Sequence, residues 1–379
     1  MEKHLHIIVP RIPHPVDNSN HYDVYQMIAA LHKNGVKIHL HCYNSSHDDI
    51  QNIVRQLCES IDFYHSENSP KIFSKPLPYI VEHKKNELLI EKLVLDDHPI
   101  LIFGIACSYV ATSPRLQQRK KFVRLYHIEF QTYKTRCFYS YNPFRRIYYW
   151  NESRLLHAYE KALIANIDGY AATCKRDMRM YHKEFDCTSV RFIPPFYSRV
   201  AEAPEGVGAY SLYFGDLSDV MHEKTVLTLL KEVYKFIHIP LVIAASNPSQ
   251  KVLDAVAKHP HVHLVINPDE ASLQDILSKA HIILLPSRYE TGIQPGLLQA
   301  LYNGRHCLAN SKVVMNTGLE SICHIADSPE AFRQRISQLY HQPFTKQEGL
   351  DRKVLLDNLY PNKTAAMLMD WIWGHSFEI

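Results

Sequence analysis

The sequence predicts two doubly wound α/β domains, each a parallel sheet with helices on both faces. Three observations support this fold class. The chain has 379 residues, which is too long for a single hydrophobic core. Apolar runs of strand length alternate with segments of helical apolar spacing along the whole chain. Pro194 and Pro195 end the first series, and residues 201–210 have linker composition.

The first domain is expected over residues 1–197. A helix is expected at 22–33, where apolar residues recur at helical spacing and Gly35 follows. A second helix is expected at 48–61. Strands are expected at 4–9, 36–43, 99–105, 122–127, 168–173 and 189–193.

The second domain is expected over residues 210–360. Its strands are expected at 211–214, 240–245, 261–266, 281–285 and 306–309, and its helices at 223–236, 250–257 and 292–302. A last helix, at about 362–374, is rich in Met, Trp and Leu. We expect this terminal segment, 361–379, to leave the second domain and pack on the first.

Residues 284–310 are the most informative stretch. The strand at its start breaks at Pro286, continues through a polar turn around Glu290, and becomes a helix that Gly304 ends. A strand, a polar turn and a helix start form a ligand-binding βαβ unit. Only 12 residues of the chain are glycine. Four of them lie in or just after this stretch, which indicates close approach of the backbone to another group: Gly292, Gly296, Gly304 and Gly318.

Composition excludes several classes of protein. A formal net charge of +3 is too small for a dedicated nucleic-acid binder, so no nucleic-acid partner is expected. No apolar run reaches the length of a membrane span, and the N-terminus has no signal-peptide pattern. The 8 cysteines form no Cys-x-x-Cys pair, which favours reduced thiols and a cytoplasmic location. The 24 histidines, including the HLH runs at 4–6 and 39–41, show no metal-ligand spacing, so no metal site is predicted.

Three segments together carry a family resemblance. They are FVRLYHIEFQTYKT (122–135) with the helix at 147–163, then YFGDLSDVMHEKTVLTLL (213–230), and finally the stretch 284–310. In this order they resemble the retaining GT-B glycosyltransferases that use nucleotide sugars, in particular bacterial members of the glycosyltransferase 1/4 superfamily. The resemblance implies a GT-B fold, in which two Rossmann-like domains face each other across a cleft. It also implies an acceptor in the first domain and a nucleotide sugar in the second.

In the first domain, the resemblance points to the end of the strand at 122–127. His127 matches the family histidine that faces the donor sugar, and we expect it to be catalytic. Ligands bind at the carboxyl ends of strands in such sheets, although a surface histidine bonded to backbone is the alternative. Glu129 is expected on the acceptor side. So are Asn18 and Asn20, in a loop that lacks the Gly-Gly of many relatives.

In the second domain, the resemblance implies a binding site for the nucleotide diphosphate. Gly215 keeps the family turn, but Asp216 stands where many relatives carry an arginine. Lys224, Arg288 and the amides at the following helix start are expected to bind the diphosphate instead. For Lys224, an ordinary exposed helix position is the alternative.

The stretch 284–310 matches the family's donor-sugar motif. Glu290 matches the first of two family glutamates and is expected to be catalytic, near the sugar. The amides of Thr291, Gly292 and Ile293 are expected to bind sugar hydroxyls and phosphate. Gln299 stands where the second glutamate belongs, and an amide can still hydrogen-bond ribose hydroxyls.

The implied reaction is transfer of a sugar from a UDP- or GDP-linked donor, with retention of configuration and without a metal or other cofactor. The sequence has no Asp-x-Asp motif. The acceptor is expected to be a glycan or a lipid-linked molecule in cell-surface polysaccharide or glycoconjugate assembly. A non-catalytic relative acting as a binding or regulatory partner is an alternative, which Asp216 and Gln299 favour. A nucleotide-sugar epimerase is another.

Residues 133–150 combine aromatic and basic side chains without an acid. Such a surface is typical of a membrane interface beside a lipid-linked acceptor. Peripheral contact with the inner face of a membrane is therefore expected. Core aromatics on a helix with solvated cations are the alternative.

Overall fold

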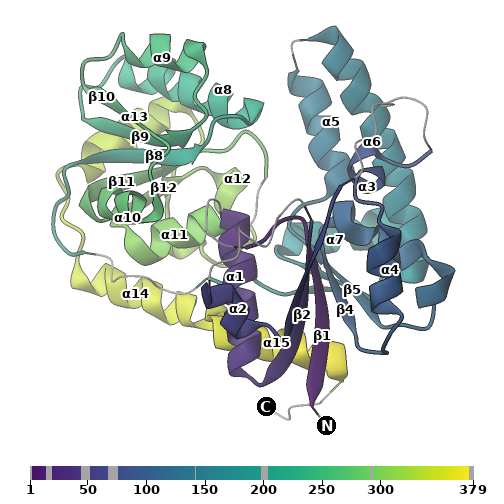
Figure 1. Cartoon of the computed structure of the whole chain (residues 1–379). Helices are drawn as coiled ribbons and strands as arrows, with labels where there is room; N and C mark the ends of the chain where they lie inside the picture. Colours follow the sequence, from purple (N-terminus) through teal and green to yellow (C-terminus); the bar gives the residue numbers. More distant parts are fainter. Residues whose placement is uncertain are drawn as a thin grey trace. The chain divides into compact units, whose positions relative to one another are not determined.

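The computed structural model describes residues 2–13, 19–43, 52–66, 76–140, 142–197, 204–290 and 293–374. Two compact units make up the chain (Figure 1). Unit 1 comprises Met1–Phe196 with Pro361–Ile379, and unit 2 comprises Tyr197–Tyr360. The chain therefore leaves unit 1 once and returns to it for its last helix.

Unit 1 contains a 7-stranded parallel sheet of order β3-β2-β1-β4-β5-β6-β7. Successive side chains of a strand point to opposite faces. Leu5 and Ile7 accordingly lie in the apolar cluster with α1, whereas Ile8 lies in the cluster on the other face. The strands are β1 (Lys3–Val9), β2 (Val36–Tyr43), β3 (Ser60–Tyr64), β4 (Ile100–Phe103), β5 (Lys121–Leu125), β6 (Gly169–Ala172) and β7 (Val190–Phe192).

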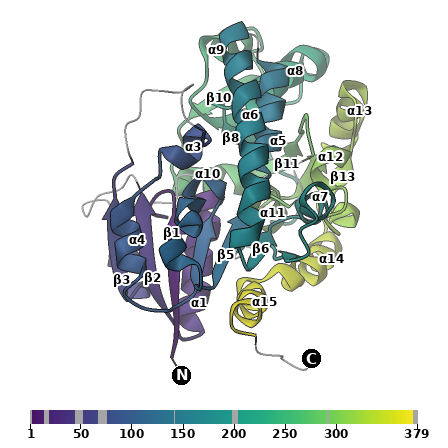
Figure 2. The ribbon, with the colours of Figure 1, turned by 90° about the vertical axis from the view of Figure 1, so that its right-hand side faces the viewer.

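Helices cover both faces of this sheet. They are α1 (Ser19–Lys33), α2 (Asn52–Leu57), α3 (Tyr79–Glu82), α4 (Glu87–Leu93), α5 (Glu129–Tyr139), α6 (Pro143–Leu163), α7 (Lys175–Phe185) and α15 (Pro361–Trp373). Short 3-10 helices lie at Ile105–Thr112, Pro114–Leu116 and Ile164–Asn166. Helices α5 and α6 lie side by side as a hairpin in both views (Figures 1 and 2).

The terminal helix α15 is part of the unit 1 core. Ala365, Leu368 and Ile372 are buried in the same cluster as α1, and Figure 1 shows α15 beside α1. Gly169 of β6 makes room for its Trp371, because a Cβ on Gly169 would lie 2.2 Å from the indole ring. The absence of a side chain at Gly169 therefore fixes how closely the terminal helix approaches the sheet.

Unit 2 contains a 6-stranded parallel sheet of order β10-β9-β8-β11-β12-β13. Its strands are β8 (Tyr210–Asp216), β9 (Leu241–Ser246), β10 (Val262–Ile266), β11 (Ala280–Leu285), β12 (His306–Ala309) and β13 (His324–Ile325). Its helices are α8 (Val220–Thr228), α9 (Gln250–Val256), α10 (Glu270–Lys279), α11 (Pro295–Asn303), α12 (Ser311–Val314), α13 (Pro329–Leu339) and α14 (Lys346–Leu356). A π-helix at Leu229–Tyr234 continues α8, and 3-10 helices lie at Glu320–Ile322 and Asp357–Leu359.

The helix expected at 48–61 is wrong at its carboxyl end. The structure has the short helix α2 and then strand β3. Val54, Leu57 and Ile61 follow helical spacing, but residues 60–64 pair in register with β2. Strand pairing with an existing edge therefore outweighs the local helical pattern.

Two further expectations differ from the structure. The helix expected from Gly292 begins at Pro295, which occupies its first turn, where proline is tolerated. The expected linker is partly held in place, because Gly206 exchanges backbone hydrogen bonds with Phe344 at 2.8 and 3.0 Å. In the described part of the chain, no helix is both long and apolar enough to cross a membrane.

Candidate functional site

His127 follows strand β5 at the carboxyl edge of the first sheet. Its Nε2 lies 3.2 Å from Glu129 Oε1, at the start of α5. Burial lowers the pKa of His127, but the adjacent Glu129 carboxylate outweighs burial and the net shift is upward. For Glu129, burial raises the pKa, and the attraction of His127 more than reverses this effect. The two predicted residues therefore each favour the charged form of the other, and the His127 side chain is 44% exposed.

Helix α6 fixes the start of α5, and with it the His127–Glu129 pair. Buried Glu160 accepts hydrogen bonds from Phe130 N at 3.0 Å and from Tyr181 Oη at 2.6 Å. Ser153 Oγ donates to Phe130 O at 2.8 Å. Burial raises the pKa of Glu160 to about 8. Ser153 and Glu160 of α6 thus position the start of α5.

A buried ion pair lies beneath the same strand end. Arg124 Nε and Nη2 each donate to Asp23 at 3.1 Å, and both side chains are fully buried. Tyr126 Oη donates to the same carboxylate at 2.5 Å, and Phe196 N donates to it as well. This network joins β5, α1 and the end of the first series. The sequence did not predict this network. Arg124 lies within an apolar strand, where an unpaired charge would be costly to bury, and the strand pattern does not reveal that Asp23 is its partner.

The structure does not test the acceptor-side role predicted for the two asparagines. Asn18 lies outside the described residues, and Asn20 lies in α1 at a position whose side chain is not described. Their predicted role stays a prediction.

In unit 2, acids occupy the turn after β8. Asp216 follows Gly215 and accepts hydrogen bonds from Ser218 N at 3.0 Å and from Ser218 Oγ at 2.7 Å. Asp219 caps α8 by accepting from Met221 N at 2.7 Å. A carboxylate thus already occupies part of the helix N-terminus, where the sequence predicts phosphate binding.

The cations expected to bind a diphosphate come from α8 and from the loop after β11, and Arg288 joins the two through hydrogen bonds to the carboxyl-terminal half of α8. Arg288, in the loop after β11, donates from Nη2 to Thr228 Oγ1 and to the Lys224 carbonyl at 3.3 Å on α8. Among the described residues, Arg288 Nε is a buried donor without a hydrogen-bond partner. Lys312 Nζ donates to the Arg288 carbonyl at 3.0 Å. Lys224, Arg288 and Lys312 are hereafter called the cation cluster.

The loop after β11 is clamped to the end of β12. Asn310 Oδ1 accepts from Ser287 N at 3.2 Å, and Asn310 Nδ2 donates to Ser287 O at 2.6 Å. Ser287 Oγ in turn donates to Tyr289 O at 2.7 Å. Asn310 and Lys312 were not predicted from the sequence. The signal available was their place directly after a strand, since neighbouring parallel strands end at the same edge of a sheet.

The predicted sugar-binding residues of this loop are only partly described. Glu290 is exposed, and Ile293 is buried. Thr291 and Gly292 lie outside the described residues. Gln299 lies on α11, half-buried, and its carbonyl accepts from Asn303 Nδ2 at 2.9 Å.

At Gly304, close packing within unit 2 explains the glycine, rather than approach of the backbone to another group. A Cβ there would lie 2.1 Å from Ile283 Cδ1 and 2.8 Å from the Ala300 carbonyl. Packing of α11 against β11 therefore requires this glycine. At Gly296 a Cβ would make only ordinary contacts, with Phe214 at 3.8 Å.

Residues 209–342, most of unit 2, match the family model of glycosyl transferases group 1. A search of curated protein sequences finds no significant match. This family match confirms the prediction of a glycosyltransferase.

Solved structures are similar over the full length of the chain. Sucrose-phosphate synthase from Thermosynechococcus elongatus has a TM-score of 0.73 at 15% identity, covering 98% of each chain. TarM has a TM-score of 0.72 at 10% identity, covering 98% of this chain and 99% of TarM. A trehalose-6-phosphate protein from E. coli bound with UDP-2-fluoro glucose has a TM-score of 0.64 at 11% identity, covering 98% and 99%. The predicted GT-B fold is confirmed.

Proposed function

We propose that this glycosyltransferase, whose second unit belongs to the group 1 family, transfers a sugar from a nucleotide-sugar donor to a glycan or lipid-linked acceptor. The cation cluster carries this proposal. Arg288 and Lys312 follow β11 and β12 at the carboxyl edge of a parallel sheet, where such sheets bind ligands, and Arg288 also bonds to the Lys224 carbonyl and keeps an unused donor. A diphosphate would complement these cations, because it carries negative charge and oxygen atoms that accept hydrogen bonds.

The reaction follows from the chemistry of the donor. The bond between the anomeric carbon and the diphosphate oxygen breaks, and the acceptor hydroxyl oxygen forms the new glycosidic bond. Its proton leaves with the diphosphate. Lys224, Arg288 and Lys312 would stabilise the charge that grows on the departing diphosphate. His127 and Glu290 are the proposed catalytic residues near the sugar. Glu129, paired with His127, is proposed to lie on the acceptor side, and Gln299 and the amides of residues 291–293 are proposed to bind donor hydroxyls.

The finer parts of the proposal rest on the family resemblance. They are retention of configuration, a metal-independent transfer, a UDP- or GDP-linked donor, and a cytoplasmic role in bacterial cell-surface polysaccharide or glycoconjugate assembly. The E. coli neighbour bound with UDP-2-fluoro glucose supports a nucleotide-sugar donor. The lack of an Asp-x-Asp motif supports a departing diphosphate held by side chains.

Binding of UDP and GDP tests the donor half of the proposal. Isothermal titration should detect one of them, and Arg288→Ala should weaken it by roughly tenfold to a hundredfold, as expected for lost hydrogen bonds to a charged group. Arg335→Ala, which removes an arginine on α13 that donates to Gln338, is the matched control. Equal affinity in Arg288→Ala and the parent protein would exclude the cation cluster as the diphosphate site.

Turnover tests the catalytic half. With a panel of UDP- and GDP-sugars, His127→Ala and Glu290→Ala should lower kcat more than they raise KM. Two carboxylates, Asp216 and Asp219, lie where a diphosphate-binding site would carry basic residues. This observation favours a second candidate function, a binding or regulatory relative without turnover. Nucleotide binding without hydrolysis or transfer from any donor would favour this second candidate.

We also propose that the α5–α6 hairpin contacts an anionic membrane beside the acceptor. Four large apolar side chains are exposed on it, at 58–80%: Phe138, Phe144, Ile147 and Trp150. An open pocket lined by Cys137, Pro143, Arg146, Ile147 and Trp150 lies among them. The basic residues of the segment 133–150 add attraction to anionic lipid, at about 1 kcal/mol each.

Flotation with phosphatidylglycerol vesicles at low salt tests this contact. The double variant Phe144→Ala and Trp150→Ala should lose most of the bound fraction. Phe236→Ala, at an exposed phenylalanine of unit 2, should bind as the parent protein does. Absence of parent protein from the vesicle fraction would exclude membrane contact through the hairpin.

A further inference from the structure

Five histidines gather on one face of the first sheet, in β1, in β2 and just before β4. His6 of β1 pairs with His39 of β2, and Ile100 of β4 pairs with His6. Paired residues share a face, as do residues two apart on a strand. His4 and His41 therefore lie on the same face as His6 and His39, and His98, two residues before β4, stacks on His4 there.

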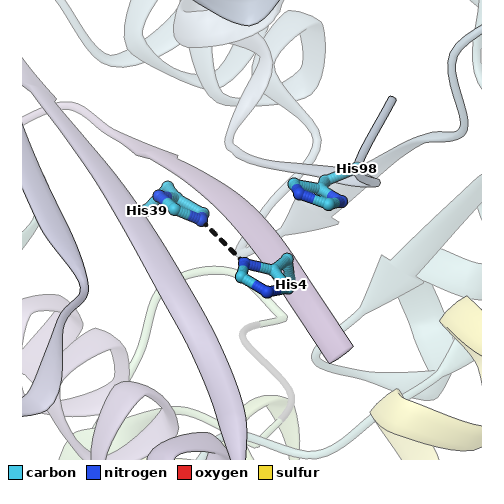
Figure 3. Close-up of side chains that lie close together, drawn as sticks. All are labelled: His4, His39 and His98. Carbon is cyan, nitrogen blue, oxygen red and sulfur yellow. Dashed lines mark hydrogen bonds between the residues drawn. The ribbon is translucent and has the colours of Figure 1, made fainter. Parts of the chain in front are cut away.

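The five rings form an inner pair and an outer trio. The inner pair has its hydrogen bonds satisfied: His6 bonds to His41 at 2.8 Å and to Asp96 at 3.0 Å, and His41 bonds to Tyr64 at 3.0 Å. The outer trio of His4, His39 and His98 is only partly buried. One ring nitrogen from each of these three lies within 4.8 Å of the others. Figure 3 shows the three rings and the hydrogen bond that joins His4 to His39.

We infer that the outer trio binds a divalent transition metal, with Zn²⁺ as the best fit. Neutral imidazole is a preferred ligand of Zn²⁺, and three histidines with an open fourth position form a known type of zinc site. Two ligands of a tetrahedral ion with Zn–N bonds of ~2.0–2.1 Å lie about 3.3 Å apart. His4 Nδ1 and His39 Nε2 are already 3.1 Å apart. The His98 ring is stacked 4.5 Å from that of His4 between ring centres, and one of its ring nitrogens lies within 4.8 Å of the other two ligand atoms.

The outward nitrogens of the trio support this assignment. A metal-bound histidine normally directs its other ring nitrogen to a carboxylate, a hydroxyl or water, which sets the tautomer. His39 Nδ1 lies 2.9 Å from Ser60 Oγ, which leaves Nε2 facing His4. His4 Nε2 lies 3.6 Å from Glu2, and His98 Nδ1 lies 3.9 Å from Asp97. Each ring therefore has an oxygen on its outer side and a nitrogen toward its neighbours.

The bound ion would join three separate segments of unit 1. It would connect β1 and the middle of β2 with the loop that precedes β4. His127 instead follows the carboxyl end of β5, whereas His4 lies near the amino end of β1 and His98 precedes β4 in the same parallel sheet. The ion would therefore link these three segments away from His127.

Titration of the metal-free full-length protein with ZnCl₂ tests the inference. A second group, His306, His324 and Glu348 in unit 2, also has ligand atoms in reach of one another. The titration is therefore made in a His324→Ala background. One equivalent of Zn²⁺ should bind and raise the Tm of unit 1. His39→Ala and His98→Ala should each weaken binding at least about tenfold, and His32→Ala, at an exposed histidine of α1, should not.

Ser60→Ala provides a variant that removes no ligand. It should weaken Zn²⁺ about tenfold or more, because partners of this kind fix ligand orientation, and circular dichroism checks that the fold is kept. The inference is overturned if the parent and the His324→Ala background bind no Zn²⁺. It is also overturned if His39→Ala and His98→Ala bind the ion as tightly as His32→Ala.

Discussion

At the scale of single residues, Glu160 links the stability of unit 1 to pH. Its carboxyl group is fully buried and is held by Phe130 N and Tyr181 Oη. Burial raises its pKa from 4.5 to about 8. Between these values the unfolded chain releases this proton and the folded chain keeps it. The Glu160 contribution is therefore complete below pH 4.5 and is lost as pH rises through about 8.

Glu160→Gln should remove this pH dependence. A glutamine keeps an acceptor for Phe130 N and offers a donor to Tyr181, but it cannot ionise. The free energy of unfolding of the parent should fall by up to about 1.4 kcal/mol per pH unit across the window, relative to the variant. Urea unfolding of both proteins at a series of pH values measures this difference. Glu91→Gln, at an exposed glutamate of α4, is the control, and parallel curves for parent and Glu160→Gln would contradict the prediction.

At the scale of elements, the contact between β6 and α15 depends on one glycine. Gly169→Ala would place a methyl group 2.2 Å from the Trp371 ring. Because both partners belong to the packed core of unit 1, we expect a loss of about 1–3 kcal/mol, as for other overpacked positions. Thermal unfolding of the variant measures this loss.

The matched control is Gly349→Ala on α14. Its Cβ would meet only Phe344, at an ordinary 3.9 Å. Alanine is also the better helix former, by about 1 kcal/mol, so this variant should be as stable as the parent or more stable. Replacing Trp371 with leucine in the Gly169→Ala protein should recover part of the loss. A neutral Gly169→Ala would show that α15 can move away at no cost.

At the scale of the whole molecule, local patterns predicted the two parallel sheets and the loops that end their strands. His127, Lys224 and Arg288 were proposed as site residues because the family resemblance and their places at a predicted strand end or helix start agree, and their roles stay predictions. Lys312 was not, since its place beside Arg288 depends on β12 lying next to β11 in the sheet.

Two other features lay beyond local reading for the same reason. The trio of His4, His39 and His98 exists only through the register of parallel strands. The expected helix included the first two residues of β3, because Ile61 continues a helical spacing, and only pairing with β2 reveals the strand. Sequence periodicity thus indicates which residues face the core, whereas the pairing partners of a strand can be identified only from the assembled sheet.

The return of the chain to unit 1 yields the last prediction. Removal of residues 361–379 should destabilise unit 1, because α15 contributes Ala365, Leu368 and Ile372 to its core, each at most 1% exposed. Loss of the leucine and isoleucine burial alone costs about 3–6 kcal/mol. Unit 2 has its own core, formed by β8, β9, β11 and the helices packed on them. Calorimetry should therefore show a lowered unit 1 transition beside a largely unchanged unit 2 transition. Removal of only residues 375–379, beyond the end of α15, is the control and should leave both transitions in place. A shorter protein that keeps the unit 1 transition of the parent would contradict the assignment of α15 to that core.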